Sequence, residues 1–222
     1  MTYRDALQSL SSNSERVLSQ LADRYLAGAI TLDTLADVAG PLLAAANVRG
    51  WQLGQLSLAG YIATVTGQPG PAPVPPPNHY ATPHRLSSAV YTAMDQGIAS
   101  EELRDYGLMR IKRLARSEPV EAAQRSYSAA MQRSSRVRGW VRSVEPDGCQ
   151  LCQWWSREGR VWPADHPMPT HKGCMCEQIP VMRERIQSTQ HTRALAHDRR
   201  VAANTEYYRR QQQDLQSREA AQ

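Results

Sequence analysis

Every cysteine of this chain lies between residues 149 and 176, and this clustering constrains the fold more than any other feature of the sequence. A Cys-x-x-Cys pair opens the stretch, and at this spacing two thiolates can turn toward one metal ion. A histidine and two more cysteines follow, so five good donors are offered for the four positions of tetrahedral zinc. His166 is a weaker sixth. We therefore expect a structural Zn2+ site formed by Cys149, Cys152, His171, Cys174 and Cys176.

Two other uses of the cysteines are weighed against zinc. Two disulfides would need an oxidising compartment, and the N-terminal residues do not resemble a signal peptide. A redox Cys-x-x-Cys usually lies at a strand-to-helix turn in a βαβ unit, and the surrounding sequence does not have that pattern.

The N-terminal region, residues 1–68, has helical patterning. Residues 2–27 predict an amphipathic helix with Thr2 as its cap and Asp5 at the third helical position. A second helical stretch runs from Thr31 to about residue 67, and Pro41 is expected to kink or divide it.

Residues 50–83 contain no charged side chain, which raises the question of a membrane span. The candidate segment, 51–66, is short and contains several polar side chains. We therefore expect a buried helix and no membrane span.

Residues 69–77 contain six of the chain's 14 prolines, a composition that excludes a helix or a central strand. We expect an extended, semi-rigid connector over residues 69–77, within a linker of residues 69–81. Helical patterning returns over 82–134, starting at Thr82-Pro83. We expect a break at 97–100, a new helix capped by Ser100, and a further helix start at Glu118-Pro119.

Residues 108–142 carry nine basic side chains against two acidic ones, whereas the net charge of the whole chain is +5. Such a stretch is either a solvated basic face or a surface that binds nucleic acid or an acidic partner. The candidate binding residues are Arg110, Lys112, Arg113, Arg116, Arg133, Arg136 and Arg138.

Residues 135–182 predict a small module around the metal donors. Residues 137–145 alternate apolar and polar side chains, as a strand does, and residues 159–162 suggest a second short strand before a proline-containing loop. Four of the five tryptophans lie in this module, and metal plus large aromatics can stabilise a unit too small for a sufficient core. The tail, 183–222, is polar with weak helical periodicity. The sequence thus predicts a mainly α-helical chain with a small zinc-stabilised α+β module and a polar helical or partly disordered tail.

The module resembles the C-terminal module of the MuF-type minor head proteins of tailed bacteriophages. The resemblance covers residues 134–182 and rests on a tryptophan-bearing strand, Asp-Gly-Cys-x-x-Cys, a Gly-Arg-Val turn, a proline-rich loop and His-x-x-Cys-x-Cys. The arginine-rich, phenylalanine-free composition is similar to that of phages of high-GC actinobacterial hosts.

This resemblance implies a minor head, or minor capsid, protein of the virion that acts in head assembly, genome packaging or DNA delivery. The implied partners are the portal protein or the major capsid protein, and the packaged DNA. The implied location is the interior of the virion head near the portal vertex, and the host cytoplasm during assembly. The excess of soft donors among tryptophans separately predicts a structural zinc ion, and we expect no enzymatic activity.

Two enzyme classes are the alternatives. A zinc-containing HNH-like nuclease would use a catalytic histidine, which His166 could provide, with Asp165 or Glu158 as a nearby carboxylate. A prohead maturation protease would need a serine–histidine pair on a β-rich scaffold, and the helical patterning of the first two-thirds argues against it. A zinc ion saturated by protein ligands also leaves no position for a reactive water.

Overall fold

The structure is a computed structural model that describes residues 2–95, 101–145, 148–183, 201–202, 205–206 and 209–213. The chain forms two compact units, Met1–Arg183 and Glu184–Gln222. The structure is 69% helical with a small three-stranded sheet, which confirms the predicted fold class.

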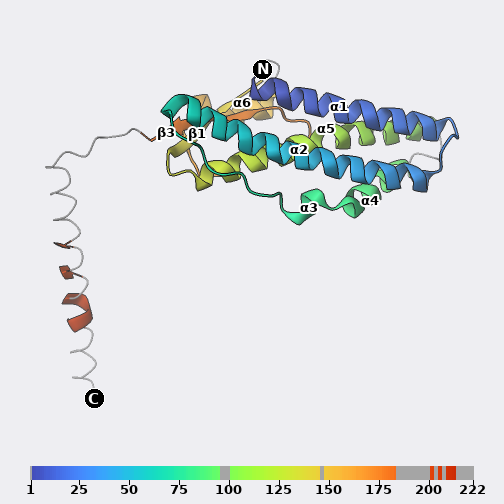
Figure 1. Ribbon diagram of the computed structural model, residues 1–222. Coiled ribbons are helices and arrows are strands. Elements are labelled where there is room, and N and C mark those ends of the chain that lie inside the picture. Colours follow the sequence, from blue (N-terminus) through green and yellow to red (C-terminus); the bar gives the residue numbers. More distant parts are fainter. Residues whose placement is uncertain are drawn as a thin grey trace. The chain divides into compact units, whose positions relative to one another are not determined.

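Long helices lying side by side make up most of the first unit (Figure 1). α2 packs against α1, α4 and α5, and the small sheet joins the bundle near the start of α1 and the end of α5. The helices are α1 (Tyr3–Leu26), α2 (Leu32–Thr66), α3 (Asn78–Ala81), α4 (Pro83–Asp95) and α5 (Glu101–Arg133).

The starts of α1 and α2 follow from their capping residues. The Thr2 side chain accepts a hydrogen bond from the Asp5 backbone N–H, and the Asp5 carboxylate accepts one from the Thr2 backbone N–H. This reciprocal capping box was predicted from the sequence and is confirmed. Thr31 caps α2 in the same way, through the backbone N–H of Thr34.

Two prolines lie inside continuous helices. Pro41 does not divide α2, so of the expected kink or division only the division is contradicted. The predicted helix start at Glu118-Pro119 is wrong, because Pro119 lies within α5. An interior proline costs about 3 kcal/mol through its lost hydrogen bond and its ring. Tertiary packing offsets this cost: Pro119 is buried, and its carbonyl lies against Gly50 of α2.

The proline-rich segment is extended, as expected, but it is attached to α2. The Trp51 indole donates a hydrogen bond to the carbonyl of Val74 over 2.9 Å, and the Val74 N–H donates to Gln55 Oε1 over 3.3 Å. Gly70 lies so close to Ala59 that a Cβ built on it would be 2.4 Å from the Ala59 Cα. The segment therefore covers one side of the helix.

Two apolar cores run through the first unit. One joins α1, α2, α4 and α5 and includes the fully buried Leu35 and Leu86. The other joins the C-terminal parts of α2 and α5 to the sheet, and in it Ile62 and Met131 pack with Trp140. The sheet therefore shares its core with the bundle. Burial of each such side chain contributes about 1.5–3 kcal/mol to the stability of both.

The sheet has the strand order β2-β1-β3, with antiparallel pairing throughout. The strand expected at 137–145 is confirmed as β1 (Val137–Ser143), and the second strand is the short β2 (Trp162–Pro163). Trp140 of β1 pairs with Trp162 on one side and Pro180 on the other. β3 (Glu177–Met182) and the short helix α6 (Gln150–Ser156) were not predicted.

The expected break at 97–100 and the Ser100 cap lie outside the described residues. So does most of the tail, although its described pieces, 201–202, 205–206 and 209–213, are helical. Within the described parts of the chain, no helix combines the length and the apolar character needed to cross a bilayer.

Candidate metal centre

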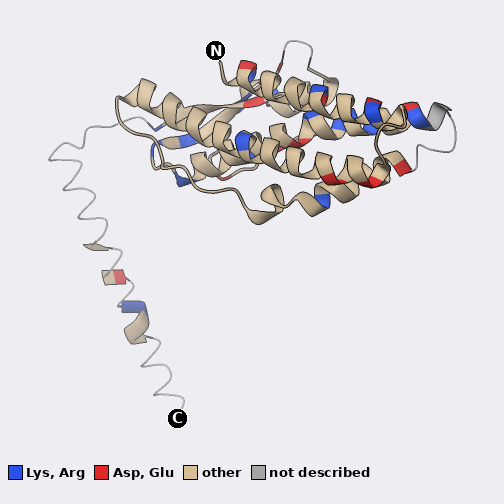
Figure 2. Cartoon of the chain, turned by 45° about the vertical axis from the view of Figure 1, so that its right-hand side comes forward, with Lys and Arg blue, Asp and Glu red and all other residues tan. Residues whose placement is uncertain are grey.

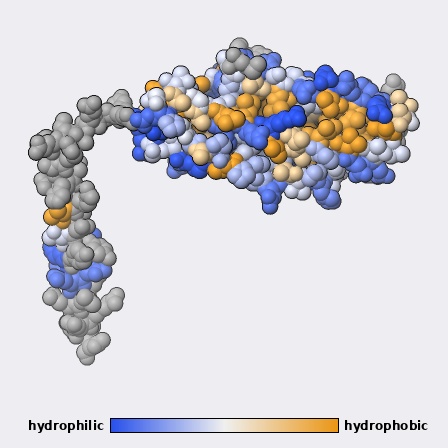
Figure 3. Space-filling view, viewed as in Figure 1, coloured by the Kyte–Doolittle hydropathy of each residue, from blue (hydrophilic) through white to orange (hydrophobic). Residues whose placement is uncertain are grey.

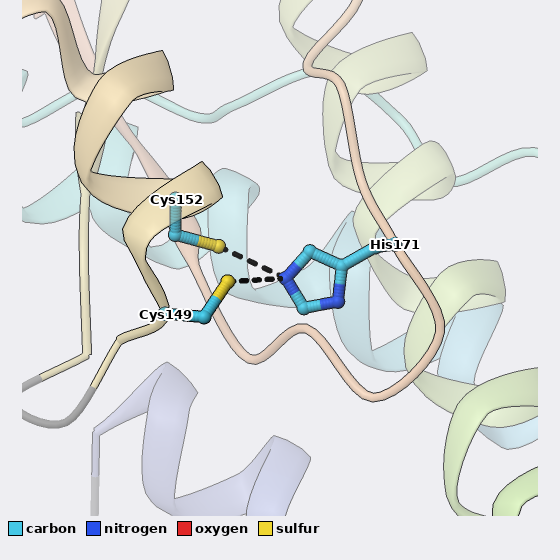
Figure 4. Close-up of side chains that lie close together, drawn as sticks. All are labelled: Cys149, Cys152 and His171. Atoms are coloured by element: carbon cyan, nitrogen blue, oxygen red, sulfur yellow. Dashed lines mark hydrogen bonds between the residues drawn. The ribbon is translucent and has the colours of Figure 1, made fainter.

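The five predicted donors come together beside the sheet, although they arise from two separate pieces of backbone. Cys149 precedes α6 and Cys152 lies in its first turn, while the other three donors lie in the loop that leads into β3. Figure 4 shows the sulfurs of Cys149 and Cys152, at the start of α6, directed at the His171 ring on the facing loop. Cys152, Cys174 and Cys176 are buried, Cys149 is exposed, and all four are free thiols.

The donors form two overlapping groups, and Cys152 belongs to both. Cys149, Cys152 and His171 have their ligand atoms within 4.8 Å of one another, and so do Cys152, Cys174 and Cys176. The cluster can therefore hold a metal ion, with Cys152 at its centre.

The spacing of the donor atoms is close to that around a tetrahedral ion. A Zn–S bond of about 2.3 Å gives a sulfur–sulfur edge of about 3.8 Å, and a sulfur–nitrogen edge is slightly shorter. The sulfurs of Cys152 and Cys174 are 3.7 Å apart. His171 Nε2 lies 3.3 Å from the sulfur of Cys149 and 3.1 Å from that of Cys152.

Local turns present the donors on both sides of the site. The N–H of Cys174 donates to the carbonyl of His171 over 3.0 Å, and Gly173, inside this turn, has a φ of +84°, which favours glycine. His171 Nδ1 lies 3.2 Å from the carbonyl of Lys172. A proton on Nδ1 satisfies this carbonyl and leaves Nε2 free to bind a metal, an arrangement common among metal-binding histidines.

The surroundings of the thiols favour thiolate at two positions. The backbone N–H groups of Cys152 and Leu151 face the Cys149 sulfur, and the hydrogen bond from Cys152 is the main cause of a lowered Cys149 pKa. A hydrogen bond from the Cys174 thiol lowers the pKa of Cys176 to about 5, and the same bond raises the pKa of Cys174. Burial raises the pKa of Cys152 to about 12. A bound metal ion would deprotonate its thiol ligands.

A buried arginine lies against the cluster. Arg142 of β1 is 5% exposed, and its Nη1 approaches the Cys174 sulfur at 4.0 Å. Its Nη2 donates to the carbonyl of Pro169, and its guanidinium lies 5.3 Å from the centre of the Trp155 ring. Because burying a charge without a partner is costly, Arg142 fits a site in which thiolates supply negative charge.

The cluster is attached to the helical bundle by one buried amide. Gln124 of α5 donates from Nε2 to the carbonyls of Cys174 and Cys176, each over 2.9 Å. Four residues further along α5, the Ser128 hydroxyl hydrogen-bonds Gln178 Oε1 at 2.5 Å. These contacts fix the Cys-x-Cys loop on α5.

A network of charges makes a second attachment. Lys172, between two of the donors, pairs with Glu121 at 2.8 Å and lies 3.7 Å from Glu118. The Glu118 carboxylate also receives two hydrogen bonds from Arg85 of α4 and one from Asn47 of α2. Burial raises the pKa of Glu118, but Arg85, Lys172 and Asn47 together outweigh this effect, and the net pKa is lowered.

The residues considered for catalysis do not join the cluster. Neither donor group includes His166, Asp165 or Glu158. The His166 ring instead stacks on Trp162 at a centroid distance of 4.3 Å, and its carbonyl accepts the Trp140 indole N–H. Asp165 and Glu158 are exposed.

The structure separates the predicted basic residues into different surroundings. Figure 2 shows blue and red segments intermixed along the helices. Lys112, Arg113 and Arg116 line a hollow of about 590 Å3 together with Lys172, whereas Arg110 lines another hollow beside α4. Arg116 pairs with Glu15 at 2.5 Å.

The remaining basic candidates are used differently. Arg133 and Arg136 hydrogen-bond the proline-rich segment and its flank, with Ala72, Pro69 and Gln68 as acceptors. Arg138 is exposed on β1. The candidate basic residues thus lie in different surroundings, and Lys112, Arg113 and Arg138 are exposed.

Sequence reasoning missed Arg142 and Gln124. Arg142 stands at an inward position of the alternating pattern of β1, which is a signal for a buried charge near the donors. Gln124 gives no comparable signal, because 50 residues separate it from the nearer cysteine carbonyl it binds. No protein-family model, curated protein or solved structure matches the chain.

Proposed function

We propose that this chain is a minor head protein of tailed bacteriophages, whose Cys/His cluster holds a structural zinc ion. The observation that carries the proposal is the convergence of Cys-x-x-Cys and His-x-x-Cys-x-Cys into one cluster fixed on a long helix. This is the motif on which the resemblance to MuF-type proteins rests, and it stands beside a helical bundle as that resemblance implies.

Zinc is the metal that suits these donors best. Thiolate and imidazole ligands at tetrahedral spacing favour zinc over magnesium, calcium or manganese, which prefer oxygen. Five protein donors are more than four-coordinate zinc needs, so no position remains for a reactive water. The ion then stabilises the fold, and we propose no enzymatic activity.

Metal analysis tests the zinc site. Protein purified without chelator should contain one zinc per chain, and its four cysteines should react with a thiol reagent only after denaturation or chelation. Protein without zinc whose thiols react equally well in the native and denatured states would overturn the proposal. Cys174→Ser and Cys176→Ser, compared side by side, identify the fourth ligand, because only the variant that lacks a ligand loses zinc.

The proposed partners are the portal or major capsid protein and the packaged DNA, and the proposed location is the head interior near the portal vertex. Lys112 and Arg113 are exposed, and no acidic partner is found for either in the described part of the chain. They supply positive charge for phosphate or for an acidic protein surface. Binding to DNA should weaken steeply as salt rises, whereas binding to a portal or capsid protein alone would leave no DNA affinity even at low salt.

Quantitative mass spectrometry of proheads and mature particles tests the head role. A small, reproducible number of copies in both is the expected result. Presence in proheads alone would indicate an assembly factor or the maturation protease. Absence from both would contradict the proposal and favour the nuclease.

A further inference from the structure

We propose that the exposed face of α2 is an antiparallel self-association surface, through which two copies of this chain form a symmetric dimer. α2 has 35 residues, and its inner side packs on α5. Its outer side carries large apolar groups in solvent: Val38 and Leu42 are each 41% exposed, and Leu56 is 60% exposed. Figure 3 shows orange side chains gathered over this helix, interrupted by blue.

The exposed residues follow the spacing of a helix-pairing seam. Outward positions recur alternately every four and every three residues, and each is exposed. This repeat keeps one stripe facing a partner helix along its length, as in two-stranded coiled coils. The seam consists of Val38, Leu42, Ala45, Arg49, Gln52 and Leu56.

The charges on this helix select a second copy as the occupant. Arg49 is the seam's one charged residue, and Asp37 stands beside the seam next to Val38. Within the described residues neither side chain has an ion-pair partner. One helix thus carries an arginine and an aspartate without ion-pair partners. A two-fold axis between two copies can bring Arg49 of each copy to Asp37 of the other, which gives two ion pairs.

The same charges decide the direction of pairing. In a parallel dimer the two Arg49 side chains would occupy the same seam level and repel each other. In an antiparallel dimer, Leu42 of one copy can pack on Ala45 of the other. That register places Arg49 opposite Val38 of the second copy and within reach of its Asp37. The paired part of the seam then runs from Val38 to Arg49, and Gln52 and Leu56 lie beyond it.

Sedimentation velocity of the full chain over a concentration series measures the dimer directly. Leu42→Glu should raise the dissociation constant by more than about tenfold, because two glutamates then enter the interface. Val65→Glu is the matched control. Val65 lies in the same helix and is 53% exposed, but it is about seven and a half turns from Val38 and so faces the other way. This variant should dimerise like the parent.

A charge swap tests the register. R49D and D37R should each weaken the dimer, and the double variant R49D/D37R should restore it. Circular dichroism should show unchanged helix content in all variants, because every altered side chain is already exposed. A chain that stays monomeric at every concentration, or a dimer indifferent to Leu42→Glu, would overturn the proposal. Failure of the double variant to recover would overturn the antiparallel register. None of these results depends on the head role or on zinc.

Discussion

Arg142 is a buried arginine that lies directly against the metal-donor cluster. Its guanidinium is buried, yet within the described parts of the chain no carboxylate lies at ion-pair distance from it. The nearby groups are the Cys174 sulfur, a carbonyl and an aromatic ring. Three thiolates and one imidazole around Zn2+ carry a net charge of about −1, which one arginine neutralises.

Replacing Arg142 should therefore weaken metal binding more than it alters the sheet. Arg142→Met keeps an unbranched side chain but removes the charge, and zinc affinity should fall by about 10–100-fold, the usual effect of losing a group next to the ligands. Competition with a chromophoric chelator measures this. Arg138→Met is the control, because Arg138 is an exposed arginine of the same strand and should leave the affinity unchanged.

Glu118 should make the chain sensitive to acid. Its pKa in the folded chain lies below the ordinary 4.5, because Arg85, with Lys172 and Asn47, outweighs the effect of burial. A lowered carboxyl pKa stabilises the fold above the unfolded-state pKa, and this contribution is lost as pH falls through the folded-state pKa. The stability gap between the parent and Glu118→Gln should thus be full near neutral pH and shrink below about pH 4.5. Denaturant unfolding of both proteins across this range measures the gap, and a gap that does not change with pH would contradict the assignment.

At the scale of elements, the contact between α2 and α5 depends on glycine. A Cβ on Gly50 would lie 2.1 Å from the carbonyl oxygen of Pro119, and one on Gly54 would lie 2.3 Å from that of Ala123. Both neighbours are backbone atoms of a long helix, which cannot move aside locally. The glycines therefore set how closely the two helices approach.

Two alanine substitutions in the same helix should have opposite effects. Gly50→Ala should destabilise the fold by about 1–3 kcal/mol through overpacking against α5. Gly60→Ala meets nothing within 4 Å and should stabilise it by about 0.5–1 kcal/mol, since alanine loses less backbone entropy in a helix. Thermal or denaturant unfolding of the two variants distinguishes them, and equal effects would show that helix propensity rather than close packing decides at Gly50.

The outcome at the two helix prolines shows where local reasoning stops. The caps at Thr2 and Thr31 were predictable because each is formed by residues three positions apart. Pro119 also gave a local signal for a helix start, but it is buried within a continuous α5, where packing against α2 outweighs the signal. Local rules therefore located the helix starts, whereas tertiary packing decided helix continuity.

At the scale of the whole molecule, the metal donors were predictable and their attachment was not. The donors are rare residue types confined to one short stretch, so the sequence alone brings them together. Their attachment to α5 through Gln124 and Lys172 uses common residue types that pair across long sequence separations. The same holds for the shared core, in which α2 residues pack on Trp140. These contacts make the module around the metal donors part of the first unit.

Removal of the metal should consequently lower the stability of the whole first unit, Met1–Arg183. Because the cluster is fixed to α5 by Gln124 and the sheet shares a core with α2 and α5, the helices and the module should unfold together when zinc is bound. Chelation removes the constraint on the loop, so the midpoint of thermal unfolding should fall, and the fluorescence of the module's tryptophans should change before helical circular dichroism is lost.

Gln124→Leu distinguishes the two contacts that can couple the module to the helices: the hydrogen bonds from Gln124 and the apolar core around Trp140. The variant removes both hydrogen bonds to the Cys-x-Cys loop and leaves all five donors in place, so zinc should still bind while the two signals cease to coincide on heating. Gln132→Leu is the control, since Gln132 is an exposed glutamine of the same helix. Coincident transitions in Gln124→Leu would show that the apolar core around Trp140 joins module and bundle without the amide. Burial of the tryptophan would then contribute more to the coupling than the two hydrogen bonds, at about 0.5–1.5 kcal/mol each.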